Sequence, residues 1–131
     1  MVDTAESAEG LGHRSFELAV EATGDHGQTI MSCSDQNFDV VLDLARHAQD
    51  CGADYIVVHA PVLSFVHERG EVLYQYYKAL CDRLDIGIAM WSHPDSGYLM
   101  QPEECARIAE LPNIVAIKYS VPREMYVRLT H

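Results

Sequence analysis

The chain has 131 residues, of which 48% are hydrophobic and 22% are charged. This composition is typical of a globular domain and argues against a disordered chain, because it supplies enough apolar surface for a core. There are 20 acidic and 9 basic residues, a formal net charge of −11. Such a surface repels nucleic-acid phosphates and anionic lipids, so we expect neither a nucleic-acid partner nor a membrane partner.

The N-terminal segment MVDTAESAEG has neither the basic region nor the apolar region of a secretory signal. No apolar run approaches the roughly 18 to 20 residues that span a bilayer, so the expected location is the cytoplasm. The 4 cysteines are widely spaced, and the 7 histidines form no H-x-H or H-E-x-x-H pattern. We interpret the cysteines as free thiols and expect no metal site and no cofactor. His59 and His93 fall near predicted strand ends and are candidate site residues.

Helical and strand patterns alternate along the chain. Residues 6–23 predict a helix that is broken or delayed by Gly10 and Gly12. Short apolar or β-branched runs predict strands at residues 29–33, 55–59, 86–91 and 114–119. Apolar residues at three- and four-residue steps predict helices at 38–49 and 71–84, and a further helix begins at Pro102 and ends before Pro112. Gly52 is a candidate helix C-cap, and a final segment begins near Pro122.

The strand runs are continuously apolar, which is typical of strands buried on both faces of a parallel sheet. Their centres are about 26 to 32 residues apart, close to the roughly 31 residues per unit of a (β/α)8 barrel. The predicted fold class is therefore α/β, part of a TIM barrel with about four βα units. Residues 1–131 then form a single partial-barrel domain. A doubly wound, flavodoxin-like sheet is the alternative, although the chain has no Gly-rich phosphate loop.

Ligands of alternating α/β folds bind beyond the carboxyl ends of the strands. Lys118 is the most informative residue there, because it closes an otherwise apolar run. A lysine enclosed by apolar walls loses solvation of its ammonium form, its pKa falls, and the neutral amine can attack a carbonyl carbon. An ordinary lysine that leaves a strand for solvent is the alternative interpretation.

The segment from Gly52 to Tyr119 resembles the pyruvate-dependent class I aldolase family typified by dihydrodipicolinate synthase and N-acetylneuraminate lyase. LPNIVAIKYS at 111–120 is similar to the family's LPNIVGIK run, whose lysine forms a Schiff base. GAD at 52–54, followed by VVHAP at 57–61, is similar to the family's GAD-x-x-x-VV-x-P. Residues 70–77 resemble its GLYQHFK helix, and IAMWSHP at 88–94 stands where the family reads ILYNVP. The resemblance implies that Lys118 is the Schiff-base lysine and that the chain covers roughly the third to sixth barrel strands.

The chain departs from the family at several functional positions. Trp91 stands where the family has a proton-relaying tyrosine, and an indole cannot act as a general acid or base. VLS at 62–64 replaces the YYN that supplies a tyrosine across a subunit interface. Asp3–Ser7 resembles only the tail of the GTTGE turn that binds the pyruvate carboxylate, and SCSD at 32–35 replaces AGTG. These changes indicate a divergent branch of the family.

The resemblance implies a set of substrate-binding candidates: Thr4, Ser34, Trp91, His93 and Tyr119. Thr4 and Ser34 can offer hydroxyls to a carboxylate, and His93 can donate to the substrate. Trp91 can wall the pocket and exclude water. Tyr119 is expected to point to the opposite face from Lys118 if the strand continues that far.

The predicted function is that of a Schiff-base (class I) lyase. Its substrate is pyruvate or another 2-keto acid, and its reaction is aldol cleavage or condensation, or hydration or dehydration. The alternative is a non-catalytic half-barrel that self-associates or needs a complementing segment, because half a barrel leaves two open strand edges and a half-exposed core. A flavodoxin-like binding module is a third possibility. The expected partners are a small-molecule keto acid and further copies of the chain in a homo-oligomer.

Overall fold

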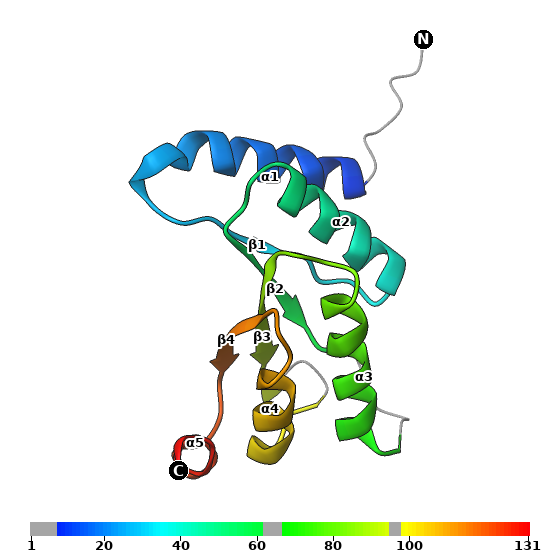
Figure 1. Cartoon of the computed structure of the whole chain (residues 1–131), viewed down its shortest axis with the longest axis vertical. Helices are drawn as coiled ribbons and strands as arrows, with labels where there is room; N and C mark the ends of the chain where they lie inside the picture. The colour runs from blue at the N-terminus through cyan, green and yellow to red at the C-terminus, as the bar shows by residue number, and fades with distance from the viewer. Residues whose placement is uncertain (1–7, 62–66, 95–97) are drawn as a thin grey trace.

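The structure is a computed structural model and describes residues 8–61, 67–94 and 98–131. Strands and helices alternate through these residues, and the strands form one parallel sheet in the order β1-β2-β3-β4 (Figure 1). In chain order the elements are α1 (Ala8–Thr23), η1 (Gly24–His26), β1 (Ile30–Ser32), α2 (Phe38–Asp50), β2 (Tyr55–His59), α3 (Arg69–Cys81), β3 (Gly87–Ser92), α4 (Pro102–Ala109), β4 (Ile114–Tyr119) and α5 (Arg123–Thr130). The predicted α/β class is confirmed. Within the described ranges, no helix is long and apolar enough to cross a membrane.

Local signals in the sequence explain where the helices begin and end. The side chain of Asn37 accepts a hydrogen bond from the Asp39 N–H at 2.9 Å, which caps the start of α2. The C-cap of α2 is Cys51, one residue before the predicted Gly52. Gly52 follows it with φ of 89°, a left-handed conformation that glycine adopts without strain, so a glycine does end this helix. Pro102 opens α4, and the Glu104 carboxylate accepts from the Gln101 N–H at 2.7 Å.

The first helix differs from its prediction. α1 runs without a break through Gly10 and Gly12, so the predicted interruption is wrong. A glycine inside a helix costs about 1 kcal/mol relative to alanine. The packing of α1 along α2 offsets this cost. A Cβ on Gly12 would lie 2.9 Å from Leu44 Cδ2, so the absence of a side chain lets the two helices approach closely.

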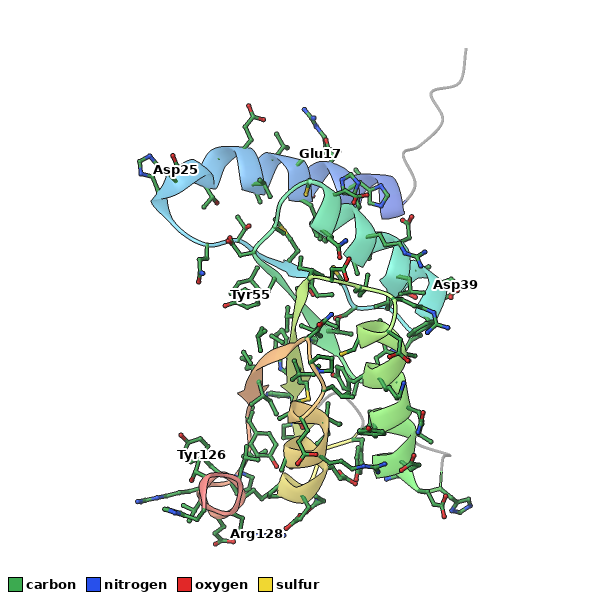
Figure 2. All side chains as sticks on the ribbon, in the orientation of Figure 1. Glu17, Asp25, Asp39, Tyr55, Tyr126 and Arg128 are labelled. Carbon is green, nitrogen blue, oxygen red and sulfur yellow. The ribbon has the colours of Figure 1, made fainter. Side chains whose placement is uncertain are left out.

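The sheet has one covered face and one open face. Along β2, Ile56 and Val58 are fully buried in the core, whereas Tyr55, Val57 and His59 remain half-buried. The prediction of strands buried on both faces is wrong, because the helices cover one side of the sheet and no described element covers the other. Figure 2 shows Tyr55 on the side of the sheet away from α3. The core between sheet and helices includes Ile56, Leu73, Tyr77, Leu80, Ile88, Met90 and Ile108.

β1 and β4 are the two edge strands of the described sheet. β4 carries one extra residue relative to β3, because Ile88 pairs with Ile114 and Ala89 pairs with Ala116. Val115 is the residue passed over, and its side chain is 59% exposed. Two open edges and an open apolar face are what the half-barrel interpretation predicts.

Candidate active site

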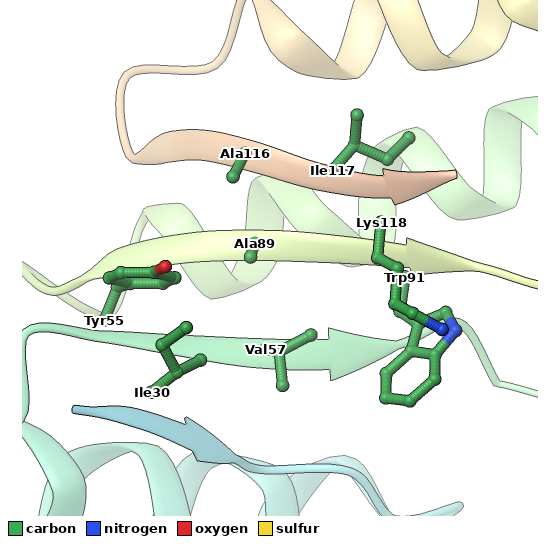
Figure 3. A pocket seen from close by; sticks show the side chains of 8 residues that line it. All are labelled: Ile30, Tyr55, Val57, Ala89, Trp91, Ala116, Ile117 and Lys118. Atoms are coloured by element: carbon green, nitrogen blue, oxygen red, sulfur yellow. The ribbon is translucent and has the colours of Figure 1, made fainter. Parts of the chain in front are cut away.

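The open face of the sheet contains a shallow hollow of about 300 Å³. It is mostly apolar, and Figure 3 shows Trp91 and Lys118 at its carboxyl end, with Tyr55 at the opposite end. The lining residues are Ile30, Tyr55, Val57, Ala89, Trp91, Ala116, Ile117 and Lys118. Lys118 is the one ionisable amine in this lining, so the chemistry of the hollow depends on it.

Three side chains, one from each of β2, β3 and β4, lie in one row across the sheet. His59 pairs with Trp91 of β3, and Trp91 pairs with Lys118 of β4. Paired residues of neighbouring parallel strands project from the same face. The row therefore ends the open face at its carboxyl edge, which is where ligands bind in α/β folds.

Trp91 is the centre of this row. The Nζ of Lys118 lies 4.1 Å from the centroid of the Trp91 ring, a cation–π contact. The ring of His59 also packs on Trp91, with 4.0 Å between centroids and a tilt of 57°. The indole N–H of Trp91 is buried and has no acceptor among the described residues. An indole N–H can only donate, so it is a suitable donor for an anionic ligand.

Lys118 itself is exposed. The sequence predicts a lysine enclosed by apolar walls, and the described part of this chain forms no such enclosure. Trp91 covers the amine on one side only, and the open face leaves the other side to solvent.

His59 is less exposed to solvent than Lys118 and lies near positively charged groups. Its pKa is lowered from the ordinary value, first by burial and then by the charges of Lys118 and His93. The Oγ of Ser34 accepts a hydrogen bond from the His59 backbone N–H at 2.9 Å, which holds the end of β2 against the segment after β1. The hydroxyl hydrogen of Ser34 can then serve a carboxylate.

The structure gathers some of the predicted site residues and separates others. Four of them interact with His59. Ser34 hydrogen-bonds to its backbone, the Trp91 ring packs on its ring, and the charges of Lys118 and His93 lower its pKa. Tyr119 is on the helix side, where its hydroxyl donates to the Met100 carbonyl oxygen at 2.7 Å. Thr4 and the VLS segment at 62–64 lie outside the described residues.

The sequence makes His59 a candidate site residue from its place near a strand end, but the resemblance does not put it among the substrate-binding residues. The available signal was positional, because His59 follows Tyr55 and Val57 at two-residue steps along β2 and so shares their face. No group of three or more His, Cys, Asp or Glu side chains suited to a metal ion occurs in the part of the chain that the structure describes.

Comparisons with a family model and with curated proteins identify the same family. The model of the dihydrodipicolinate synthetase family matches residues 13–129. A 4-hydroxy-tetrahydrodipicolinate synthase of Methanothrix thermoacetophila is 32% identical over 118 residues, covering 88% of this chain and 39% of that protein. That of Syntrophus aciditrophicus is 34% identical over 120 residues, covering 88% and 40%. The chain thus spans about 40% of the length of these curated relatives.

Solved structures show the same fold. Dihydrodipicolinate synthase of Thermotoga maritima superimposes with a TM-score of 0.83 at 26% identity, covering 96% of this chain and 43% of that one. The chloride-inhibited enzyme of Acinetobacter baumannii, in complex with pyruvate, has a TM-score of 0.83 at 22% identity and covers 98% and 45%. The four parallel strands therefore match part of a TIM barrel.

Proposed function

Because this chain belongs to the dihydrodipicolinate synthetase family, we propose that it carries the Schiff-base half of a class I lyase acting on pyruvate or another 2-keto acid. The observation that carries the proposal is the position of Lys118. It is the last but one residue of β4, on the open face, in the hollow at the carboxyl edge of the sheet. A relative from Acinetobacter baumannii has been solved with pyruvate, which supports the substrate class.

The chemistry begins with the neutral amine of Lys118. It attacks the ketone carbon of the acid, and loss of water leaves an imine. The protonated imine withdraws electrons from the neighbouring carbon, which permits aldol cleavage or condensation, or hydration or dehydration. Lys118 thus supplies both the covalent bond and the electron sink.

The keto acid also needs a partner for its carboxylate. The buried indole N–H of Trp91 and the hydroxyl of Ser34 are donors at the same edge of the sheet. We assign them to carboxylate binding. Trp91 is the more informative of the two, because a buried donor without an acceptor costs about 1 to 3 kcal/mol and a bound carboxylate relieves that cost.

Reductive trapping tests the proposal. The chain is incubated with pyruvate and borohydride, and its intact mass is measured. The sequence has only two lysines, Lys78 and Lys118. Lys118→Arg keeps the positive charge but cannot form an imine, whereas Lys78→Arg is the matched control. Lys78 is a suitable control because it is paired with Asp82 at 2.6 Å at the partly exposed end of α3, away from the hollow. We expect the adduct in the wild type and in Lys78→Arg, and its loss in Lys118→Arg.

The second candidate function is a non-catalytic half-barrel that self-associates or accepts a complementing segment. The exposed apolar side of the sheet favours it, since Ile30 on that face is 52% exposed. Sedimentation velocity over a range of concentrations tests it. We expect a concentration-dependent dimer or larger species that Ile30→Lys weakens, and a monomer at all concentrations contradicts self-association.

A further inference from the structure

We infer that His59 is the catalytic residue that transfers protons in this site. The indole of Trp91, which stands where the family has its proton-relaying tyrosine, cannot perform this role. The inference rests on the imine chemistry proposed for Lys118. The observation behind it is the row in which His59, Trp91 and Lys118 are paired residues on three neighbouring strands.

The strand register places an acid–base group, His59, on the same face as Lys118 and two strands away from it. Adjacent strands are about 4.8 Å apart, so the backbones of β2 and β4 are separated by roughly 10 Å. Within that gap both side chains contact the same indole, the His59 ring at 4.0 Å and the Lys118 Nζ at 4.1 Å from the Trp91 centroid. The reacting carbon of a keto acid bonded to Nζ is the atom next to the imine carbon, so the proposed step requires the bound acid to extend past the indole towards His59.

The protonation state of His59 suits the role of a base. Burial and neighbouring positive charge both disfavour the imidazolium form of His59. The charges come from Lys118 of β4 and from His93, which follows β3. Imidazole is therefore neutral at neutral pH and ready to accept a proton. The backbone of His59 is fixed by its hydrogen bond to Ser34, which holds the strand end in place.

The proposed step balances without any further reactant. Neutral His59 removes a proton from the methyl carbon of the protonated pyruvate imine, and the C–H electron pair forms the enamine double bond as the C=N electrons return to nitrogen. The products are an enamine and an imidazolium. In condensation, the enamine carbon attacks an aldehyde and the imidazolium gives its proton to the resulting alkoxide.

The test separates imine formation from proton transfer. The chain is incubated with pyruvate in deuterated buffer, and the methyl signal of pyruvate is followed by NMR, while parallel samples are trapped with borohydride. His59→Phe keeps an aromatic ring against Trp91, and His59→Gln keeps a polar side chain. His26→Gln is the control, because His26 is exposed in η1 before the start of β1.

We expect both His59 variants to slow deuterium exchange by about 100-fold, the usual size of a general-base contribution, with trapping at Lys118 unchanged. His26→Gln should exchange at the wild-type rate. In the wild type, exchange should fall below pH 6.5 as His59 is protonated, and this loss should be absent from the residual exchange of the variants. Trapping without exchange in the wild type, or exchange within about twofold of wild type in both variants, overturns the role of His59. Absence of trapping in the wild type instead overturns the proposed imine chemistry.

Discussion

The amine of Lys118 lies over the face of Trp91, with 4.1 Å between Nζ and the ring centroid. The indole face attracts the ammonium ion and has no comparable attraction for the neutral amine. The same ring that walls the hollow therefore holds the lysine in place across the strand pair β3–β4.

The strength of that contact is measurable. A double-mutant cycle with Trp91→Leu, Lys118→Met and the double variant should give a coupling energy of about 0.5 to 1 kcal/mol in urea denaturation, the range for exposed cation–π pairs. A coupling energy of zero within error would show that the two side chains do not stabilise one another in solution.

His59 should also make stability depend on pH. Its folded pKa is lowered relative to the ordinary value of 6.5, so the unfolded chain binds more protons in the interval between the two values. The free energy of unfolding therefore rises with pH across that interval, and this contribution is present above pH 6.5 and lost as the pH falls through the folded pKa.

Thermal unfolding checks this sign. Between about pH 7.5 and about pH 5, His59→Phe should lose less stability than the wild type, because the variant has no imidazole to protonate. His26→Gln serves as the control and should follow the wild type. An equal loss in His59→Phe and in the wild type would contradict the lowered pKa.

Tyr77 ties α3 to the sheet beneath the site. Its ring is fully buried, and its hydroxyl donates to the Val58 carbonyl oxygen at 2.9 Å. Tyr77→Phe removes this buried hydrogen bond, so we expect a loss of about 1 kcal/mol in the free energy of unfolding. Tyr126→Phe, at a side chain that is 56% exposed, should change stability by less than about 0.5 kcal/mol. Similar losses in the two variants would show that the buried hydrogen bond is not the cause.

Much of the fold could be predicted from local patterns. The runs at 55–59 and 114–119 gave the bounds of β2 and β4, and the helix signals at Gly52 and Pro102 were correct. The continuity of α1 could not be predicted, because the favourable term is its packing against α2 near Leu44, a contact between distant segments. The open face of the sheet was missed for a related reason. An apolar run indicates that its side chains favour burial. It does not indicate whether another element of the chain packs over them.

The site was predictable in part. The resemblance pointed to Lys118, Trp91, Ser34 and His93, and these residues do meet at one edge of the sheet. Neither the stacking of Lys118 on Trp91 nor the row that joins both residues to His59 could be predicted, since both depend on the register between strands. Tyr119 shows the value of strand alternation, because its hydroxyl bonds to Met100 on the face opposite to Lys118, as the two-residue period indicates.

Peptide mapping of the borohydride-reduced pyruvate adduct tests the central claim most directly, because the sequence offers only Lys78, Lys118 and the N-terminal amine as sites for an imine. We expect fragmentation to place the reduced adduct on Lys118 in the wild-type chain, and excess pyruvate to protect this residue from amine-reactive reagents. An adduct distributed over Lys78 and the N-terminus, with Lys118 unmodified, would contradict it.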